Sequence, residues 1–143
     1  LTRLVGSEMC IRDRPLGIDQ SEVKLNGHSI ECRINAEDPD RDFMPQAGEV
    51  KTFVAPGGLG VRMDSHVRSG YRIPPFYDSM IGKLIVHAPS REEAITRMRG
   101  ALSDLRIGPG KSTAPLHSKL LDRPEFRTVD MDIHWVERML KED

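Results

Sequence analysis

A short alternating segment carries the residues that are best suited to chemistry. Its apolar positions are Ile30, Cys32 and Ile34, and its polar positions are Glu31, Arg33 and Asn35. Successive side chains of a strand point to opposite faces, so one face can enter a core and the other is charged. A guanidinium stays charged at any working pH and offers a rigid fork of donors. It suits an anionic group, or an oxygen on which charge develops during a reaction.

Arg33 is therefore the strongest single candidate for a functional residue. The alternative is a surface ion pair between Arg33 and Glu31 on the same face, which would contribute little to stability. The alternation alone favours the surface pair. Deciding between a solvated surface and the floor of a polar site is the main question that this segment raises.

Asp78 is a second, weaker candidate, because it lies in a proline-bounded loop just before an apolar run at residues 79–87. Loops at strand ends often carry function. The alternative is a turn or capping role for the carboxylate. Lys83 interrupts the apolar run and needs a partner if it is buried, for which Asp78 or Glu31 would serve.

Other motifs favour structural roles. The glycine-rich segment 57–60 continues into an extended run rather than a helix, so a tight turn is favoured over a phosphate loop. Asp64, Ser65 and His66 are adjacent, whereas a hydrolytic triad is assembled from distant segments, so we expect turn and hydrogen-bonding roles.

His28 and Cys32 lie roughly 13 Å apart on a strand, too far to share one metal ion. Five histidines without a Cys-x-x-Cys or His-Glu-x-x-His motif make a metal site unexpected.

The composition indicates one ordinary globular domain of 143 residues. The net charge is −1 and no basic block is present, which gives no electrostatic support to nucleic-acid binding. Apolar runs are too short to cross a bilayer, and two cysteines make no disulfide framework. We therefore expect a soluble, cytoplasmic domain without membrane contact.

The pattern of elements predicts strands first and helices afterwards. Extended runs are expected at residues 22–25, 28–35, 49–54, 61–64 and 79–87, the first two joined as a hairpin by Asn26-Gly27. Ser90 and Glu93 form a capping box for a helix that ends before Gly108. Shorter helices are expected at residues 115–121 and 122–126, and a last one capped by Asp132 has an apolar stripe. That stripe comprises Ile133, Val136, Met139 and Leu140. The order favours an α+β fold, an antiparallel β-sheet with helices packed on one side.

Residues 1–14 do not fit this organisation. Residues 4–14 resemble a translated sequencing adapter, and a short native helix is the alternative. We therefore divide the chain into a non-native segment (1–14), a connector (15–20) and one domain (21–143). Cys10 falls in the excluded segment. The expectation that follows is that the natural chain extends further upstream.

Four motifs together resemble one family. They are residues 27–39 (GHSIECRINAEDP), residues 55–62 (APGGLGVR), residues 64–66 (DSH), and residues 70–71 with 74–84 (GY and PPFYDSMIGKL). These are similar to the C-terminal domain of biotin carboxylases, over about residue 15 to the end. The likeness is greatest to the biotin carboxylase subunit of bacterial acetyl-CoA carboxylase. Propionyl-CoA, methylcrotonyl-CoA and pyruvate carboxylases share the motifs.

The resemblance implies a role for particular residues. The whole enzyme of this family is an ATP-grasp ligase that uses ATP and bicarbonate to carboxylate biotin on a carrier protein. The arginine matching Arg33 binds biotin and stabilises the enolate oxygen, and the aspartate matching Asp78 lies near it. The residues matching Leu59 and Arg62 lie at the homodimer interface. Many relatives carry an aromatic residue in place of Leu59, and residues 106–111 are richer in proline and glycine than usual.

The resemblance also implies what lies elsewhere. The family's ATP-binding residues and its ligands for Mg²⁺ or Mn²⁺ precede this domain, so we expect no ATP site and no metal site here, and no turnover by this polypeptide alone. Implied partners are the biotin carboxyl carrier protein, a second copy in a homodimer, and carboxyltransferase subunits. Three alternatives stay open. One is the corresponding part of a propionyl-CoA, methylcrotonyl-CoA or pyruvate carboxylase. The others are a non-catalytic module that binds a biotinyl carrier or a carboxylase subunit, and a structural domain without a ligand.

Overall fold

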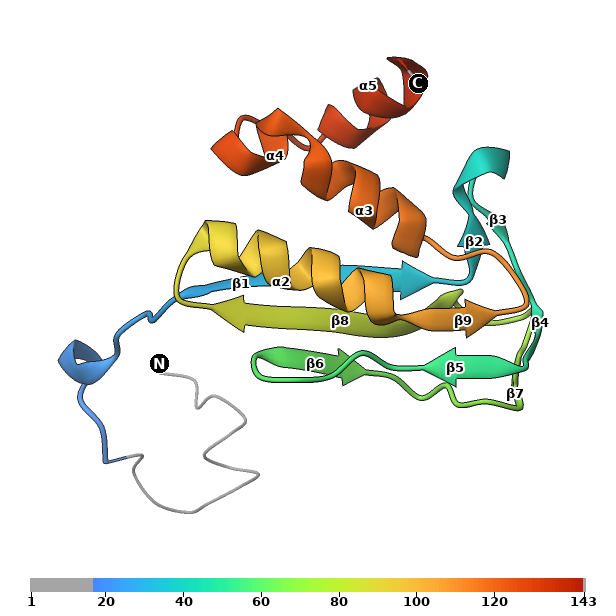
Figure 1. Ribbon diagram of the computed structural model, residues 1–143, viewed down its shortest axis with the longest axis horizontal. Helices are drawn as coiled ribbons and strands as arrows, with labels where there is room; N and C mark the ends of the chain where they lie inside the picture. The colour runs from blue at the N-terminus through green and yellow to red at the C-terminus, as the bar shows by residue number, and fades with distance from the viewer. Residues whose placement is uncertain (1–16, 143) are drawn as a thin grey trace, which may run out of the picture.

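The computed structural model describes residues 17–142, in which most strands precede the helices (Figure 1). The segment proposed to be adapter-derived, with Cys10, and the first two connector residues lie outside the described range. The strands are β1 (His28–Asn35), β2 (Glu37–Asp38), β3 (Met44–Pro45), β4 (Gly48–Val50), β5 (Thr52–Val54), β6 (Val61–Asp64), β7 (Tyr71–Ile73), β8 (Met80–Ala88) and β9 (Arg106–Gly108). The helices are α2 (Arg91–Asp104), α3 (Ala114–Asp122), α4 (Pro124–Thr128) and α5 (Trp135–Glu142), with 3-10 turns η1 (Gln20–Glu22) and η2 (Pro39–Arg41).

The central sheet has β8 in the middle, between β1 and β6, with both pairings antiparallel. Arg33 lies opposite Lys83, and Lys83 lies opposite Asp64, so one row of the sheet carries three charged residues. The predicted strands at residues 28–35, 61–64 and 79–87 are confirmed. The apolar run of β8 is not buried throughout, because Lys83 is half-buried and His87 is exposed.

Helix α2 covers the apolar face of this sheet (Figure 1). The predicted capping box is present, since the Ser90 side chain accepts from the Glu93 amide and the Glu93 side chain accepts from the Ser90 amide. The core contains Ile30, Cys32 and Ile34 of β1, Leu84 and Val86 of β8, and Ala94, Ile95 and Met98 of α2. Burial of one such large aliphatic side chain contributes about 1.5–3 kcal/mol. The alternation read from the sequence therefore marks the core face correctly.

The predicted strand at residues 49–54 is divided at Lys51. Strand β4 pairs with β7, whereas β5 pairs with β9, so the two halves belong to different ladders. Val50 is 2% exposed and Val54 is 51% exposed, so the two valines do not share a buried face. Strands β7 and β9 lie where the sequence predicts a loop and a helix end, because three-residue strands carry too little periodicity to be recognised.

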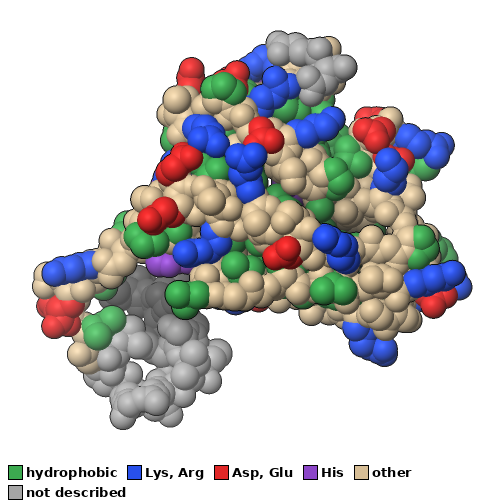
Figure 2. Space-filling model, viewed as in Figure 1, with side chains coloured by type: hydrophobic (Ala, Val, Ile, Leu, Met, Phe, Trp, Pro, Cys, Tyr) green, Lys and Arg blue, Asp and Glu red, His purple; other side chains and the backbone are tan. Residues whose placement is uncertain are grey.

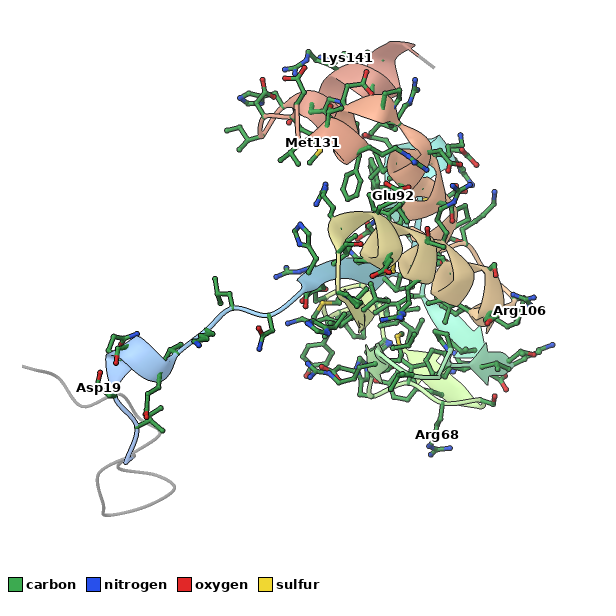
Figure 3. The ribbon with its side chains drawn as sticks, turned by 60° about the vertical axis from the view of Figure 1, so that its left-hand side comes forward. Asp19, Arg68, Glu92, Arg106, Met131 and Lys141 are labelled. Atoms are coloured by element: carbon green, nitrogen blue, oxygen red, sulfur yellow. The ribbon has the colours of Figure 1, made fainter. Side chains whose placement is uncertain are left out.

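The predicted hairpin at Asn26-Gly27 is wrong. Residues 17–27 form an arm that reaches away from the sheet and includes η1, and Asp19 near its far end is labelled in Figure 3. Leu25 is 98% exposed, so its side chain does not hold the arm against β1. The partner of β1 is β8, which offers a ladder along the whole strand. Gly27 does adopt the positive φ of +73° that its turn chemistry favours.

The C-terminal helices follow the prediction with shifted boundaries. Helix α3 has Pro115 in its first turn, and α4 begins after Arg123 rather than after a cap at Asp122. Asp132 accepts a hydrogen bond from the His134 amide before α5 begins. Trp135 is 9% exposed, whereas Ile133 is 90% exposed, so the buried stripe of α5 starts later than predicted.

The architecture confirms the α+β class, with antiparallel ladders and α2 and α3 on one side of the central sheet. Positive and negative side chains are interspersed on the face shown in Figure 2, without a patch of one sign. Within residues 17–142, no helix combines the length and apolar character that a bilayer crossing requires.

Candidate functional site

The polar face of β1 presents Arg33 to solvent. Its Nε lies 3.6 Å from Oε1 of Glu31, and the two side chains are 69% and 42% exposed. The surface pair that the sequence left as an alternative is therefore present. A pair this exposed contributes at most about 1 kcal/mol and leaves the guanidinium free to turn toward another anionic oxygen. The ion pair and a binding role for Arg33 are compatible.

The backbone of Arg33 is held by the start of α3. The Thr113 hydroxyl donates to the carbonyl oxygen of Arg33 at 3.0 Å and accepts from the amide of Asn35 at 3.0 Å. The Thr113 amide donates to the carbonyl oxygen of Asn35 at 3.0 Å. Thr113 is 6% exposed, so the loss of these bonds would leave buried polar groups unpaired. The backbone under Arg33 is thus more constrained than its side chain.

His117 adds a second donor to the same carbonyl. Its Nε2 lies 2.7 Å from the carbonyl oxygen of Arg33, so the ring carries its proton on Nε2 there. Burial lowers the pKa of His117 from its ordinary 6.5, and the hydrogen bond to Arg33 opposes that shift. The neutral imidazole is therefore the form that this position favours near pH 7. Sequence reasoning missed Thr113 and His117, since no local signal connects them with Arg33.

Asp78 performs the turn role that was its alternative. Its Oδ1 accepts from the amide of Met80 at 2.7 Å, at the entrance to β8. Phe76 and Tyr77 in the same loop are 89% and 81% exposed. No hydrogen bond or ion pair found within residues 17–142 joins Asp78 to Arg33. The sheet brings their two segments together at one end, because Asn35 lies opposite Met80.

The two residues implied at an interface lie near each other in the chain, on and before β6. Leu59 is 92% exposed in the turn that precedes β6, and Arg62 forms an ion pair with Asp64 at 3.0 Å. An aliphatic side chain this exposed has no packing role in the described part of the chain. Its accessibility is compatible with a contact to another surface.

In the part of the chain that the structure describes, Lys83 has neither of the carboxylates, Asp78 and Glu31, that would serve as its partner if it were buried. It lies across the sheet from Arg33 on one side and Asp64 on the other, and no ion pair of its ammonium is found in the described range. Since it is only half-buried, solvent can satisfy the charge that full burial would have left unpaired. The condition for that partner, a buried Lys83, is therefore not met.

The remaining motifs make no relay or ligand set. Asp64 pairs with Arg62, and His66 packs edge-on against Tyr71 with ring centroids 5.2 Å apart. Burial raises the pKa of the Cys32 thiol to about 12, so it is not a thiolate nucleophile near neutral pH. Among residues 17–142, no group of three or more His, Cys, Asp or Glu side chains could hold a metal ion.

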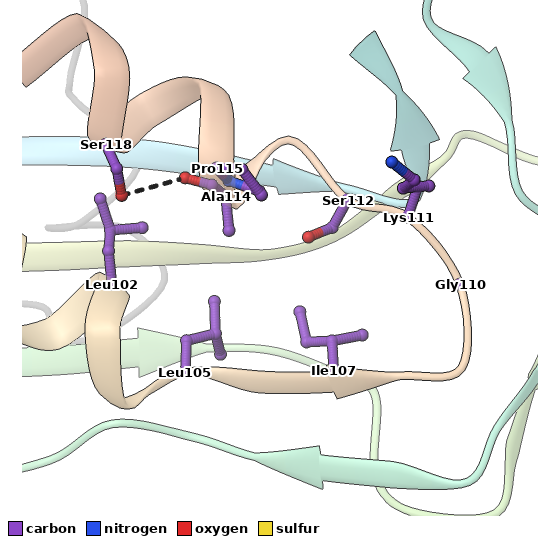
Figure 4. A pocket seen from close by; sticks show the side chains of 9 residues that line it. All are labelled: Leu102, Leu105, Ile107, Gly110, Lys111, Ser112, Ala114, Pro115 and Ser118. Atoms are coloured by element: carbon purple, nitrogen blue, oxygen red, sulfur yellow. Dashed lines mark hydrogen bonds between the residues drawn. The ribbon is translucent and has the colours of Figure 1, made fainter. Parts of the chain in front are cut away.

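A pocket of about 320 Å³ lies beside the start of α3. Leu102, Leu105 and Ile107 form its apolar wall, as Figure 4 shows. Ser118 across the pocket donates to the carbonyl oxygen of Ala114 at 3.4 Å within α3. Neither Arg33 nor Asp78 lines this pocket.

Comparison with known proteins identifies related chains. The family model of the biotin carboxylase C-terminal domain matches residues 31–138. A biotin carboxylase from Nostoc sp. is 48% identical over 126 residues, which are 88% of this chain and 28% of that protein. One of the pyruvate carboxylase subunits from Methanothermobacter thermautotrophicus is 48% identical over 122 residues, which are 85% of this chain and 25% of the relative.

Solved structures agree with the sequence comparisons. A biotin carboxylase from Campylobacter jejuni in complex with β-γ-ATP superposes with a TM-score of 0.80 at 43% identity, covering 85% of this chain and 27% of that one. The biotin carboxylase subunit of a pyruvate carboxylase superposes with a TM-score of 0.85 at 40% identity, covering 90% and 28%. The chain therefore spans 25–28% of the length of these relatives.

Proposed function

Because the chain belongs to the biotin carboxylase C-terminal domain family, we propose that it supplies one wall of the biotin site in a biotin carboxylase. The proposed enzyme is a ligase that consumes ATP and bicarbonate and carboxylates biotin on a carrier protein. The observation that carries the proposal is the exposed guanidinium of Arg33, whose backbone carbonyl is held by Thr113 and His117 and whose donor end is open to solvent beside Glu31.

The proposed role of Arg33 follows from the charge of its donors. Removal of the ureido proton of biotin places negative charge on the ureido oxygen. A guanidinium directed at that oxygen would stabilise the charge as it develops, which accelerates the reaction rather than only tightening ground-state binding. Asp78 is a weaker candidate in the same site. Leu59 and Arg62 would contact a second copy in a homodimer.

We assign ATP and its Mg²⁺ or Mn²⁺ to parts of the enzyme that precede this domain. Within residues 17–142 no group of acidic side chains is arranged for a metal ion. The carboxylated carrier would pass to carboxyltransferase subunits, which choose the final substrate. We place the chain in a cytoplasmic acetyl-CoA carboxylase of fatty acid synthesis. A pyruvate carboxylase is the second candidate, favoured by the 48% identity to the pyruvate carboxylase relative.

The test compares Arg33→Ala with Arg68→Ala in the intact carboxylase. Arg68 is an exposed arginine away from β1, labelled in Figure 3, and serves as the matched control. Loss of a donor to a developing oxyanion lowers kcat by about 10²–10³-fold, so free-biotin carboxylation should fall by that order for Arg33→Ala only. Unchanged carboxylation would favour a non-catalytic module or a purely structural domain.

A second experiment addresses this polypeptide alone. We expect no biotin-dependent ATP hydrolysis by the purified chain, because the ATP site is proposed to lie upstream. Phosphate release above that of a blank without protein would contradict this part of the proposal. Adding the separately expressed upstream part and recovering activity would support it.

A further inference from the structure

The carboxylate of Glu37 joins the two segments that carry Arg33 and Asp78. Its Oε1 accepts from Nδ2 of Asn35 at 3.2 Å, and the same oxygen accepts from the hydroxyl of Ser79 in a very short hydrogen bond. Asn35 follows Arg33 by two positions on β1, and Ser79 directly follows Asp78. Glu37 therefore connects Asn35 with a hydroxyl that lies 42 positions after Glu37 in the chain.

The bridge lies where the regular ladder between β1 and β8 is interrupted. The register shifts between Ile34 and Asn35, and the Ala36 amide then donates to the carbonyl oxygen of Ser79 at 2.8 Å. β1 ends and β8 begins at this end of the sheet (Figure 1). An irregularity of this kind bends a strand and weakens its pairing, so side-chain bonds are needed to set the local geometry.

Few other contacts hold the Asp78 loop. Its neighbours Phe76 and Tyr77 are 89% and 81% exposed. Within residues 17–142, the hydrogen bond found for the Asp78 side chain runs forward, to the amide of Met80. In the described part of the chain, the Ser79 hydroxyl is the one side chain of residues 76–80 that is hydrogen-bonded to the segment of Arg33. Glu37 is half-buried, where a hydrogen bond is stronger than at the surface.

We infer that Glu37 is a positioning residue, which fixes the Asp78–Ser79 turn against the end of β1 and so sets the placement of Asp78 relative to Arg33. The inference rests on the proposed function, because it concerns the geometry of the biotin site. Glu37 accepts hydrogen bonds from Asn35 and Ser79. Its proposed effect comes from holding these two residues in place and not from contact with biotin.

The experiment measures free-biotin carboxylation by the intact carboxylase with Glu37→Ala, Glu37→Gln and Ser79→Ala. Small misplacements in a site cost up to about 10²-fold in rate, and we expect kcat/KM for biotin to fall by about tenfold for Glu37→Ala and Ser79→Ala. The KM for ATP should not change. Glu37→Gln should retain most activity, because its amide oxygen still accepts both hydrogen bonds. Glu49→Ala, an exposed glutamate on β4, is the control.

The double variant Arg33→Ala/Glu37→Ala separates positioning from general loosening. If Glu37 acts through the Arg33 site, the double variant should be no less active than Arg33→Ala alone. Full additivity, or unchanged biotin kinetics in both Glu37→Ala and Ser79→Ala, would overturn the inference. If Arg33→Ala itself leaves carboxylation unchanged, the proposed function fails, and that result is distinguishable from a failure confined to Glu37.

Discussion

The Thr113 hydroxyl donates to the carbonyl oxygen of Arg33 across 80 residues of sequence, at 3.0 Å. The same hydroxyl accepts from the amide of Asn35, so one side chain satisfies the strand on both sides of Ile34. Thr113 lies just before α3. It forms hydrogen bonds with backbone groups of β1 that a neighbouring strand would otherwise bind. The position of Arg33 is thus coupled to the start of a helix far along the chain.

Replacement of Thr113 by valine should destabilise the fold, because valine keeps the shape and removes both bonds of the hydroxyl. A buried donor or acceptor that is left unpaired costs about 1–3 kcal/mol. We expect a loss of that size in the free energy of unfolding, measured by urea titration, and a smaller loss for Thr113→Ser. Thr128→Val is the control, since the Thr128 hydroxyl bonds only within α4 and is exposed. Equal losses of unfolding free energy for Thr113→Val and Thr128→Val would contradict a stabilising role for the buried hydrogen bonds of Thr113.

Acid should destabilise the chain through His117. Burial lowers the pKa of His117 below 6.5, so the folded state binds fewer protons than the unfolded state between the two pKa values. Stability therefore rises with pH in that window, and it is lost as pH falls from 6.5 toward the folded pKa. His117→Gln should flatten this part of the profile, measured as unfolding free energy between about pH 8 and pH 5.

The matched control for the pH profile is His134→Gln. His134 is 63% exposed and lies 3.5 Å from Glu137, away from the sheet. A profile that flattens equally in both variants would show that burial of His117 is not the cause. A profile unchanged by His117→Gln would show the same.

Cys32 should be unreactive in the folded chain. Burial raises its thiol pKa from 9.0 to about 12, so its thiolate at pH 8 is on the order of a thousandfold scarcer than for an ordinary thiol. In a Cys10→Ser background, we expect labelling by a thiol-specific disulfide reagent to be slow until urea unfolds the chain. Rapid labelling of Cys32 without denaturant would contradict the burial of this face of β1.

Two glycines should respond to alanine in opposite directions. A Cβ at Gly82 would lie 2.6 Å from the Met63 side chain and 3.0 Å from the Asp64 carbonyl oxygen, so Gly82→Ala should destabilise by about 1–3 kcal/mol. Gly100 in α2 has open space around its Cβ position, so Gly100→Ala should stabilise by up to about 1 kcal/mol. Thermal unfolding measures both, and the same sign for the two variants would be evidence against this packing.

Local signals were sufficient for the elements with strong periodicity. The alternation of residues 28–35 predicted β1 and its buried face, and Ser90 with Glu93 predicted the start of α2. The hairpin at Asn26-Gly27 failed because turn residues permit a hairpin without supplying a partner strand. The positive φ of Gly27 is present, and the strand that pairs with β1 lies more than 40 residues later.

The site was predictable only in part. Arg33 stands out from its strand pattern, and its proposed role comes from the family resemblance rather than from its surroundings. Thr113, His117 and Glu37 carry no local signal for their contacts, since hydroxyls, histidines and glutamates are common on surfaces. Their hydrogen bonds depend on tertiary structure that brings residues 42 to 84 positions apart together.

The cover that α3 gives to β1 is incomplete. Its hydrogen bonds reach the outer edge of β1 only at Arg33 and Asn35, and none of those found within residues 17–142 covers that edge from His28 to Cys32. An uncovered edge is a row of backbone donors and acceptors onto which another extended segment can add. The half of β1 that precedes Arg33 therefore presents the unpaired backbone groups that the addition of another strand requires.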